Sequence, residues 1–199
     1  MRAARVGVLA VVLVAAALVL RIAYVNDTPG YVLRHDAVDY DVHARSIAQG
    51  EGFSKTLAHG RPTAFRPPGY PYFLAGVYRL GGRDWLRSHD RVVAGRIANA
   101  VVGTAIVALL GLLCAQLFGR RVALVAMALA AVYVPLILAG GALMSEPLFA
   151  ALMLGALVAA VRFRGSDRRN CTAAASAPSV SAAKSGSDIS APPARISGT

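Results

Sequence analysis

Four long apolar runs dominate this chain and restrict it to few folds. Residues 6–20, 101–118, 122–144 and 147–161 each lack a charged side chain. A helix needs roughly 17–25 residues to cross about 30 Å of hydrocarbon, so four crossings fit this pattern. Only helices and closed barrels satisfy their backbone polar groups in lipid, and no segment alternates with the period of two that a barrel needs. The runs predict an all-α membrane protein with about four transmembrane helices.

The composition and the flanks of the runs define the expected domains. The chain is 56% hydrophobic and 16% charged, whereas soluble domains average about 25% charged residues. We expect residues 1–164 to form one transmembrane domain, with spans over about 6–25, 92–118, 121–139 and 145–163 and a large loop over 26–91.

A cleaved signal peptide is the alternative for the first run. That run continues for about 20 residues, beyond the usual 7–15 of a signal, so we expect it to be retained.

The composition changes abruptly after Arg164 to Ala, Ser, Pro and Gly with scattered charges. Such a segment has too few apolar side chains to form a core, so residues 165–199 are predicted to be a disordered low-complexity tail. The abruptness of the change also indicates a truncated or frame-shifted product.

The short basic segments predict the orientation. Arginines precede the first span, fill the turn between the second and third spans, and follow the fourth span (Arg2, Arg5, Arg120, Arg121, Arg162, Arg164, Arg168 and Arg169). The positive-inside rule places these segments in the cytoplasm and the loop over 26–91 outside, across the plasma membrane. The loop itself carries nine Arg and Lys residues, but the rule is weak for loops longer than about 60 residues. An excess of cations in an external loop indicates that the loop binds anionic ligands. The simpler alternative is a basic loop that is solvated near lipid headgroups.

Two short amphipathic surface helices are predicted within the loop. In a helix over residues 37–49, five side chains fall on one stripe: Ala37, Tyr40, Ala44, Ile47 and Ala48. The glycines at 50 and 52 are expected to end this helix. A second helix is expected over 69–80, after two prolines and before two glycines. Tyrosines and a tryptophan near the span ends indicate that the loop lies at the membrane interface.

Asp36 directly precedes the first of these loop helices. Asp is a favoured N-cap, so helix capping is one interpretation. A carboxylate at the membrane boundary can also act as a general base or help hold a divalent cation. Tyr40 and His43 follow at positions that share its helix face, and we expect them to bind substrate. Asp39 and Asp41 are expected to be solvated first-turn acids that complement the helix dipole.

Glu146 is the second candidate carboxylate, at the expected outer end of the fourth span. Helix initiation explains it in part, because Ser145 can cap the helix and Pro147 suits its first turn. Ionisable groups at the edge of hydrocarbon are costly, however, and tend to mark functional sites. The predicted topology puts Glu146 on the same side as Asp36, so we expect both carboxylates to be catalytic.

Three further residues are candidates for substrate binding. Arg66 opens the segment Arg-Pro-Pro-Gly-Tyr-Pro, whose prolines restrict it, and arginine binds phosphate in a bidentate manner. Tyr70 belongs to the same segment, and Arg96 lies just inside the second span. The alternative for the arginines, and for Arg21 in the first span, is that they extend to lipid headgroups.

The pattern Asp-x-x-x-Tyr over residues 36–40, the Arg-Pro-Pro element and the sequence Ser-Glu-Pro-Leu over 145–148 together resemble the N-terminal part of GT-C type membrane glycosyltransferases. That group includes dolichyl-phosphate-mannose protein mannosyltransferases and related bacterial enzymes of the cell envelope. The resemblance covers about residues 6–164. It implies that a sugar is taken from a polyprenyl-phosphate donor at the outer face of the membrane and passed to an acceptor that the sequence does not identify.

The resemblance also implies roles: Asp36 as the base that deprotonates the acceptor, Arg66 as a contact to the donor phosphate and Glu146 as a second acid. Such enzymes typically have about ten or more spans, so a truncated chain would lack donor-binding helices and be inactive alone. The alternative is a small non-catalytic membrane protein whose basic external loop binds anionic lipid or a partner chain. The formal charge of +11 does not indicate nucleic acid, because the cations flank membrane spans and no nucleic-acid-binding fold is visible.

Overall fold

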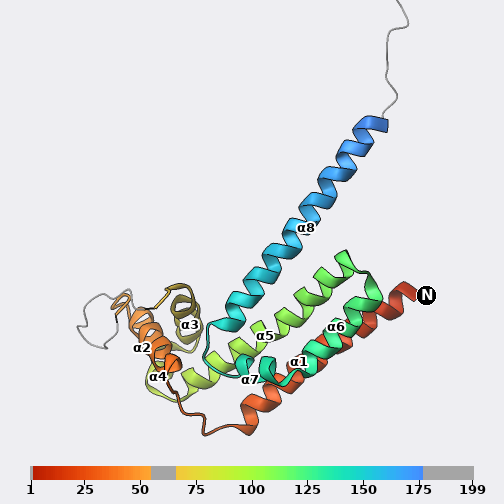
Figure 1. Cartoon of the computed structure of the whole chain (residues 1–199). Helices are drawn as coiled ribbons and strands as arrows, with labels where there is room; N and C mark the ends of the chain where they lie inside the picture. The colour runs from red at the N-terminus through yellow and green to blue at the C-terminus, as the bar shows by residue number, and fades with distance from the viewer. Residues whose placement is uncertain (1, 55–65, 177–199) are drawn as a thin grey trace, which may run out of the picture. The chain divides into compact units, whose positions relative to one another are not determined.

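The computed structural model describes residues 2–54 and 66–176 of this chain (Figure 1). Within these residues it has eight helices and no β-strand. The helices are α1 (Arg2–Asp27), α2 (Asp36–Gln49), α3 (Gly69–Leu80), α4 (Gly82–Arg87), α5 (Asp90–Leu117), α6 (Arg120–Val132), α7 (Val134–Gly140) and α8 (Glu146–Ser176). The all-α prediction is therefore confirmed.

Three of these helices, α1, α5 and α8, are long and apolar enough to cross a membrane, and α6 with α7 makes a fourth crossing if the bent pair is one span. We predicted the third span to be a single helix over 121–139. Instead it bends by 62° between α6 and α7. Tyr133 has an extended backbone there (ψ 106°), and Pro135 lies in the first turn of α7, where its missing N–H and fixed φ do least harm to a new helix.

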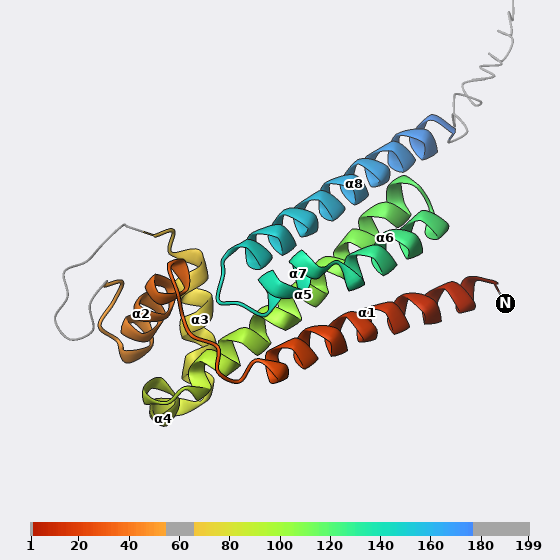
Figure 2. The same ribbon diagram turned by 60° about the horizontal axis from the view of Figure 1, so that its bottom comes forward.

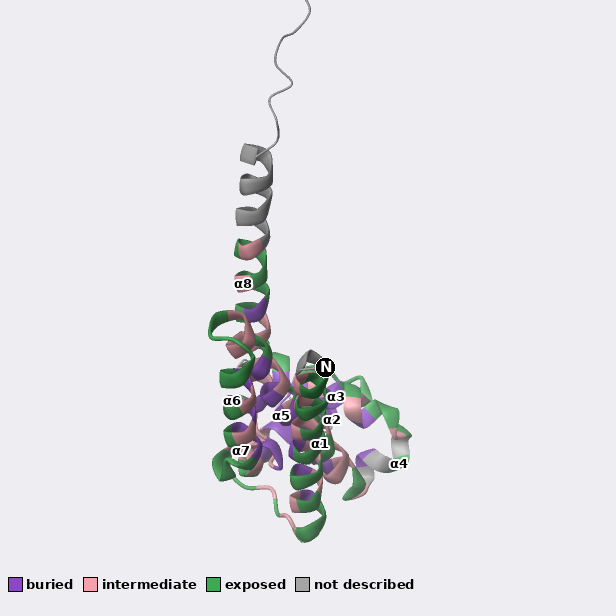
Figure 3. Cartoon of the chain, turned by 90° about the vertical axis from the view of Figure 1, so that its right-hand side faces the viewer, coloured by how far each residue is buried: buried purple, intermediate pink, exposed green. Residues whose placement is uncertain are grey.

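Helices α1, α5 and α6 pack side by side (Figure 2). Their common core consists of Ala17 on α1, Val107 on α5, and Met127, Ala130 and Ala131 on α6. Small side chains allow such close approach of membrane helices. Figure 3 shows buried residues gathered along α5. On α1 and α6, apolar side chains such as Val11 and Leu129 are exposed. Exposed apolar side chains on these segments are suited to lipid.

Arg21 lies in the C-terminal third of α1 and is fully buried. Its guanidinium donates to the carbonyl oxygens of Ala17 (2.9 Å) and Ala130 (3.5 Å). Ala130 is in the last turn of α6, where carbonyl groups lack an amide partner within the helix. Our alternative that Arg21 extends to lipid headgroups is wrong, because its charge is turned inward toward the break between α6 and α7.

The segment between α1 and α5 contains helices that pack against each other and against the start of α5. The predicted helices over 37–49 and 69–80 are present as α2 and α3, which pack against each other. Tyr40, Ala44 and Ile47 of α2 form a buried core with Leu74 and Tyr78 of α3. Gly50 ends α2 in the left-handed conformation (φ 87°), which glycine adopts without steric cost. This core holds α2, and the acidic residues at its start, in a fixed place.

The last helix extends further than its sequence suggested. Contacts divide the chain into one unit up to Arg164 and a second from Gly165 onward. We predicted disorder from residue 165, but α8 continues to Ser176, and its last turn contains three consecutive alanines, the strongest helix former. The remainder of the predicted disordered tail, 177–199, lies outside the described residues.

Candidate functional site

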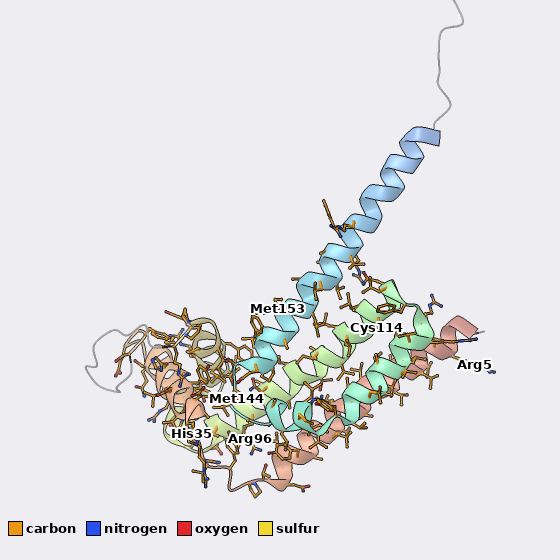
Figure 4. The ribbon with its side chains drawn as sticks, viewed as in Figure 1. Arg5, His35, Arg96, Cys114, Met144 and Met153 are labelled. Carbon is orange, nitrogen blue, oxygen red and sulfur yellow. The ribbon has the colours of Figure 1, made fainter. Side chains whose placement is uncertain are left out.

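Segments that are far apart in the sequence meet at one end of the α1–α5–α6 bundle. Figure 4 shows His35, Arg96 and Met144 at this end, and Arg5 and Cys114 at the other. His35 precedes α2, and Met144 lies in the loop before α8. The N-terminus of α2, the start of α5 and the loop over 141–145 therefore belong to the same end of the bundle.

The centre of the site is a cluster of two carboxylates and one arginine at the start of α2. Arg66 Nη2 lies 2.5 Å from Asp36 Oδ1 and 2.8 Å from Asp39 Oδ2, and its Nε is 3.2 Å from the same Asp39 oxygen. Hydrogen bonds to Asp39 and then Asp36 raise the pKa of Arg66. One cation shared by two carboxylates leaves the cluster with a formal charge of −1, and 44% of the Asp36 side chain remains exposed.

Two of our expectations about the acids of α2 need correction. Asp36 is the first residue of α2, and the N-cap is His35, which makes no side-chain capping bond. Asp39 was expected to be a solvated acid pointing elsewhere, but it binds Arg66 together with Asp36. The reason is geometric: residues three apart on a helix share a face.

Tyr40 connects this cluster to the loop before α8. The Arg66 guanidinium lies 5.5 Å from the centre of the Tyr40 ring, and the Tyr40 hydroxyl forms a hydrogen bond of 3.0 Å with the hydroxyl of Ser145. Tyr70 meets the Tyr40 ring edge-on, with ring centres 4.9 Å apart. Arg66, Tyr40, Tyr70 and Ser145 thus form one continuous contact chain.

Glu146 is the first residue of α8, directly after Ser145, and is exposed. We expected Ser145 to cap this helix with its side chain, but its hydroxyl is bonded to Tyr40 and its carbonyl oxygen accepts the Phe149 N–H (3.0 Å). Burial, more than any charge, raises the pKa of Tyr70, and the Glu146 carboxylate adds to this shift. Glu146 is therefore close enough to act electrostatically on Tyr70, whose ring meets that of Tyr40.

Arg96 and Asn99 of α5 hold the loop over 141–145 from beneath. Arg96 is fully buried; its Nε donates to the Gly141 carbonyl (2.6 Å) and its Nη1 to the Thr28 carbonyl (2.9 Å). Asn99 Nδ2 lies within hydrogen-bond distance of the carbonyls of Ala142 (2.5 Å) and Met144 (3.1 Å) and the Tyr70 hydroxyl (2.9 Å). Sequence reasoning did not assign Asn99 this role.

The expected substrate-binding residues therefore divide into two groups. Arg66 and Tyr40 lie in or beside the acidic cluster, whereas Arg96 and Tyr70 are bonded within the protein. His43 is fully buried, with Nδ1 2.5 Å from the Asp39 carbonyl oxygen and its ring 4.5 Å from that of Phe53. These positions indicate that Arg96 and His43 support the site from behind, whereas Tyr70 also lines a cavity beside Tyr40.

A small cavity of about 260 Å³ opens beside Tyr40 and Ser145. Tyr70, Pro67 and Gly69 line one side, and apolar residues of α8 line the other (Leu148, Phe149 and Leu152). The site therefore combines a charged cluster with an adjacent apolar surface. Across the described parts of the chain, no group of three or more His, Cys, Asp and Glu side chains is arranged to hold a metal ion.

A second charged cluster was missed entirely. Asp41 is buried (3% exposed), and its carboxylate accepts from Arg91 Nε (3.0 Å) and Arg91 Nη2 (3.1 Å) and from the Tyr78 hydroxyl (2.9 Å). We expected a solvated acid, which is wrong. The sequence did indicate that Asp41 is buried, because it lies four residues after Ala37 and three before Ala44 and so falls on the apolar stripe of the helix.

Comparison with known proteins identifies one family. Residues 65–176 match the family model described as dolichyl-phosphate-mannose-protein mannosyltransferase. The matched segment includes Arg66, Arg96 and Glu146, whereas Asp36 and Tyr40 precede it. No curated protein and no solved structure matches the chain.

Proposed function

Because this chain belongs to the dolichyl-phosphate-mannose-protein mannosyltransferase family, we propose that it transfers a sugar from a polyprenyl-phosphate donor to an acceptor at the outer face of the membrane. Its apolar helices make it an integral membrane protein, and its family is one of glycosyltransferases. The observation that carries the proposal is the contact between Asp36 and Arg66 at 2.5 Å, at the end of the bundle where the loop helices and the start of α8 meet.

The two groups have complementary parts in such a transfer. Asp36, which is partly exposed, takes the proton from the acceptor as that group attacks the anomeric carbon of the sugar. The bond between this carbon and the phosphate oxygen breaks, and its electron pair leaves with the lipid phosphate. Arg66 stabilises the negative charge on the departing phosphate.

Arg66 can also exchange one of its two carboxylate partners for the donor phosphate. Arg66 binds both Asp36 and Asp39 in the structure. When the donor phosphate occupies one edge of the guanidinium, Asp39 can retain the other edge, and Asp36 is then free to accept a proton. Glu146, one residue from the Tyr40–Ser145 hydrogen bond, serves as the second acid that shapes the acceptor side.

The proposed orientation follows from the exposed arginines at the opposite end. Arg120 and Arg121 begin α6 and are exposed. The positive-inside rule favours the cytoplasm for that short turn, which places α2, α3 and Glu146 at the outer face of the plasma membrane.

The non-catalytic alternative has less support. It requires a loop whose cations are available to anionic lipid or a partner. Arg91 is paired with Asp41, and Arg79 donates to the carbonyls of Ile47 (2.7 Å) and Ala48 (3.3 Å). These cations are therefore engaged in building the loop.

The test is sugar transfer by the purified chain in lipid nanodiscs, with polyprenyl-phosphate mannose labelled in the sugar as the donor. Asp36→Asn is expected to reduce the rate by about 10²–10⁴-fold, the usual contribution of a general base, while donor binding persists. Arg66→Gln is expected to weaken donor binding itself. Asp84→Asn, which changes an exposed carboxylate on α4, is the matched control. Equal and measurable transfer rates for the wild type and Asp36→Asn would refute the role of Asp36 as the base, and equal and measurable donor binding for the wild type and Arg66→Gln would refute the role of Arg66.

A further inference from the structure

An apolar groove lies between α1, α5 and α6, in the half of the bundle that holds Arg5 and Cys114 (Figure 4). Its volume is about 480 Å³. Small residues form much of its wall, among them Ala15 on α1, Ala108 and Ala115 on α5, and Ala123 on α6. Its floor is tight, since a Cβ added to Gly111 would overlap Met127 Sδ. The groove therefore results from missing side-chain volume along three packed helices.

One lining residue differs from all the others. Arg120, the first residue of α6, is charged and exposed, whereas the other lining residues are apolar. Arg121 and Arg5 are also exposed at this end of the bundle. A chemically complementary occupant has a long apolar portion for the groove and one anionic group for the arginine.

A buried amide gives additional support. Both side-chain polar atoms of Gln116 are buried and lack a hydrogen-bond partner among the described residues. Gln116 lies one turn after Leu112 and one residue after Ala115, both of which line the groove, and four residues before Arg120. A polar group brought to this flank would be able to satisfy the amide, which is costly to leave unpaired in an apolar setting.

We propose that this groove binds an anionic phospholipid of the adjacent leaflet, with an acyl chain along α1, α5 and α6 and the headgroup phosphate at Arg120. Rim residues such as Val11 and Leu112 are exposed, so the groove opens to the hydrocarbon from which the chain enters. A second copy of this protein is a poorer occupant. Parallel packing would bring the exposed Arg5, Arg120 and Arg121 of both copies to the same end, where like charges repel.

The experiment measures lipids retained by the whole chain after delipidation in detergent and re-addition of phosphatidylglycerol or phosphatidylcholine, by native mass spectrometry. The wild type is expected to retain one phosphatidylglycerol molecule in preference to phosphatidylcholine. Arg120→Gln should lower its occupancy roughly fivefold, the effect of one cation near an anionic headgroup. Arg121→Gln, which changes an adjacent arginine outside the groove lining, is the matched control and should have a smaller effect.

Two variants fill the groove from different helices, so that misfolding of one does not decide the test. Ala15→Leu on α1 and Ala115→Leu on α5 should each abolish retention while circular dichroism shows unchanged helix content. Equal retention of both lipids by the wild type would overturn the proposal, as would full retention in the folded groove-filling variants. A dimer that these substitutions abolish would identify a second copy as the occupant and would also overturn it.

Discussion

Asp41 is a charged side chain at a position that belongs to the apolar stripe of α2. Its carboxylate is buried, and it is held by Arg91 from α5 and Tyr78 from α3. Removing one partner of a buried ion pair leaves an uncompensated charge, which is far more costly than replacing the pair. This residue therefore connects the loop helices to the start of a membrane span.

Asp41→Ala is expected to lower the free energy of unfolding by about 3 kcal/mol or more, because Arg91 loses its counter-charge. Equilibrium unfolding in mixed micelles measures the change. Tyr78→Phe removes a single hydrogen bond and should lower the same free energy by about 1 kcal/mol. Exposed Asp84, changed to Asn, should have no measurable effect. A loss for Asp41→Ala no larger than that of the Asp84 control would show that the pair does not hold the loop.

The buried tyrosines give a second prediction at this scale. Burial raises the pKa of both Tyr70 and Tyr78, and Asp41 raises that of Tyr78 further, from an ordinary value of 10.0. The folded chain therefore keeps two phenolic protons that the unfolded chain releases above pH 10. Their contribution to stability is complete below that pH and is lost as the pH rises through the raised values.

Tyrosinate absorbance measures this directly. Near about pH 11, where ordinary tyrosines are mostly ionised, the folded protein should show about two fewer tyrosinates than the denatured protein. Tyr70→Phe and Tyr78→Phe should each reduce that difference by one. Identical titration curves for the folded and denatured protein would contradict the burial of these rings.

At the scale of elements, local sequence patterns predicted the helices of the loop closely. The stripe from Ala37 to Ala48 and the proline and glycine boundaries of the second helix were sufficient to place α2 and α3, because both helices bury one face locally. The break between α6 and α7 was not predicted. Its apolar run is continuous, and Pro135 is tolerated in membrane helices, so hydropathy alone could not distinguish a bend from a straight span.

Arg96 and Asn99 hold the loop over 141–145 through contacts between segments that are distant in the sequence. No sequence pattern indicated these contacts. Asn99→Ala removes hydrogen bonds to two loop carbonyls and to Tyr70. We expect faster amide hydrogen exchange over residues 141–145 and a transfer rate reduced about tenfold or more, since displacement by about 1 Å can cost 10²-fold, with donor binding little changed.

Thr104→Ala on the same helix is the control for this prediction, because among the residues that the structure describes the buried Thr104 hydroxyl bonds only to the Ala100 carbonyl, within α5. Its exchange pattern over 141–145 should match that of the wild type. If Asn99→Ala and Thr104→Ala exchange alike in this segment, Asn99 does not hold the loop.

At the scale of the whole molecule, the runs of apolar residues were enough to predict a helical membrane protein, because the requirement for backbone hydrogen bonding in lipid leaves few alternatives. The acidic cluster was only partly predictable. Asp36 and Arg66 were selected for their chemistry, but their direct contact across 30 positions, with Asp39 as a third member, depends on the packing of α3 against α2. Orientation remains a prediction, and it determines which side of the membrane the proposed chemistry faces.

Single cysteines test the orientation in a background where Cys114 and Cys171 are replaced by serine. Val32 precedes α2 and Phe118 lies in the turn between α5 and α6, and both side chains are exposed (66% and 68%). If the basic turn beside Arg120 is cytoplasmic, a membrane-impermeant maleimide should label Val32→Cys in intact cells and Phe118→Cys only after permeabilisation. Their similar exposure makes the two positions matched controls for reactivity. The reverse pattern would place Asp36 and Arg66 in the cytoplasm, where a donor at the outer face could not reach them.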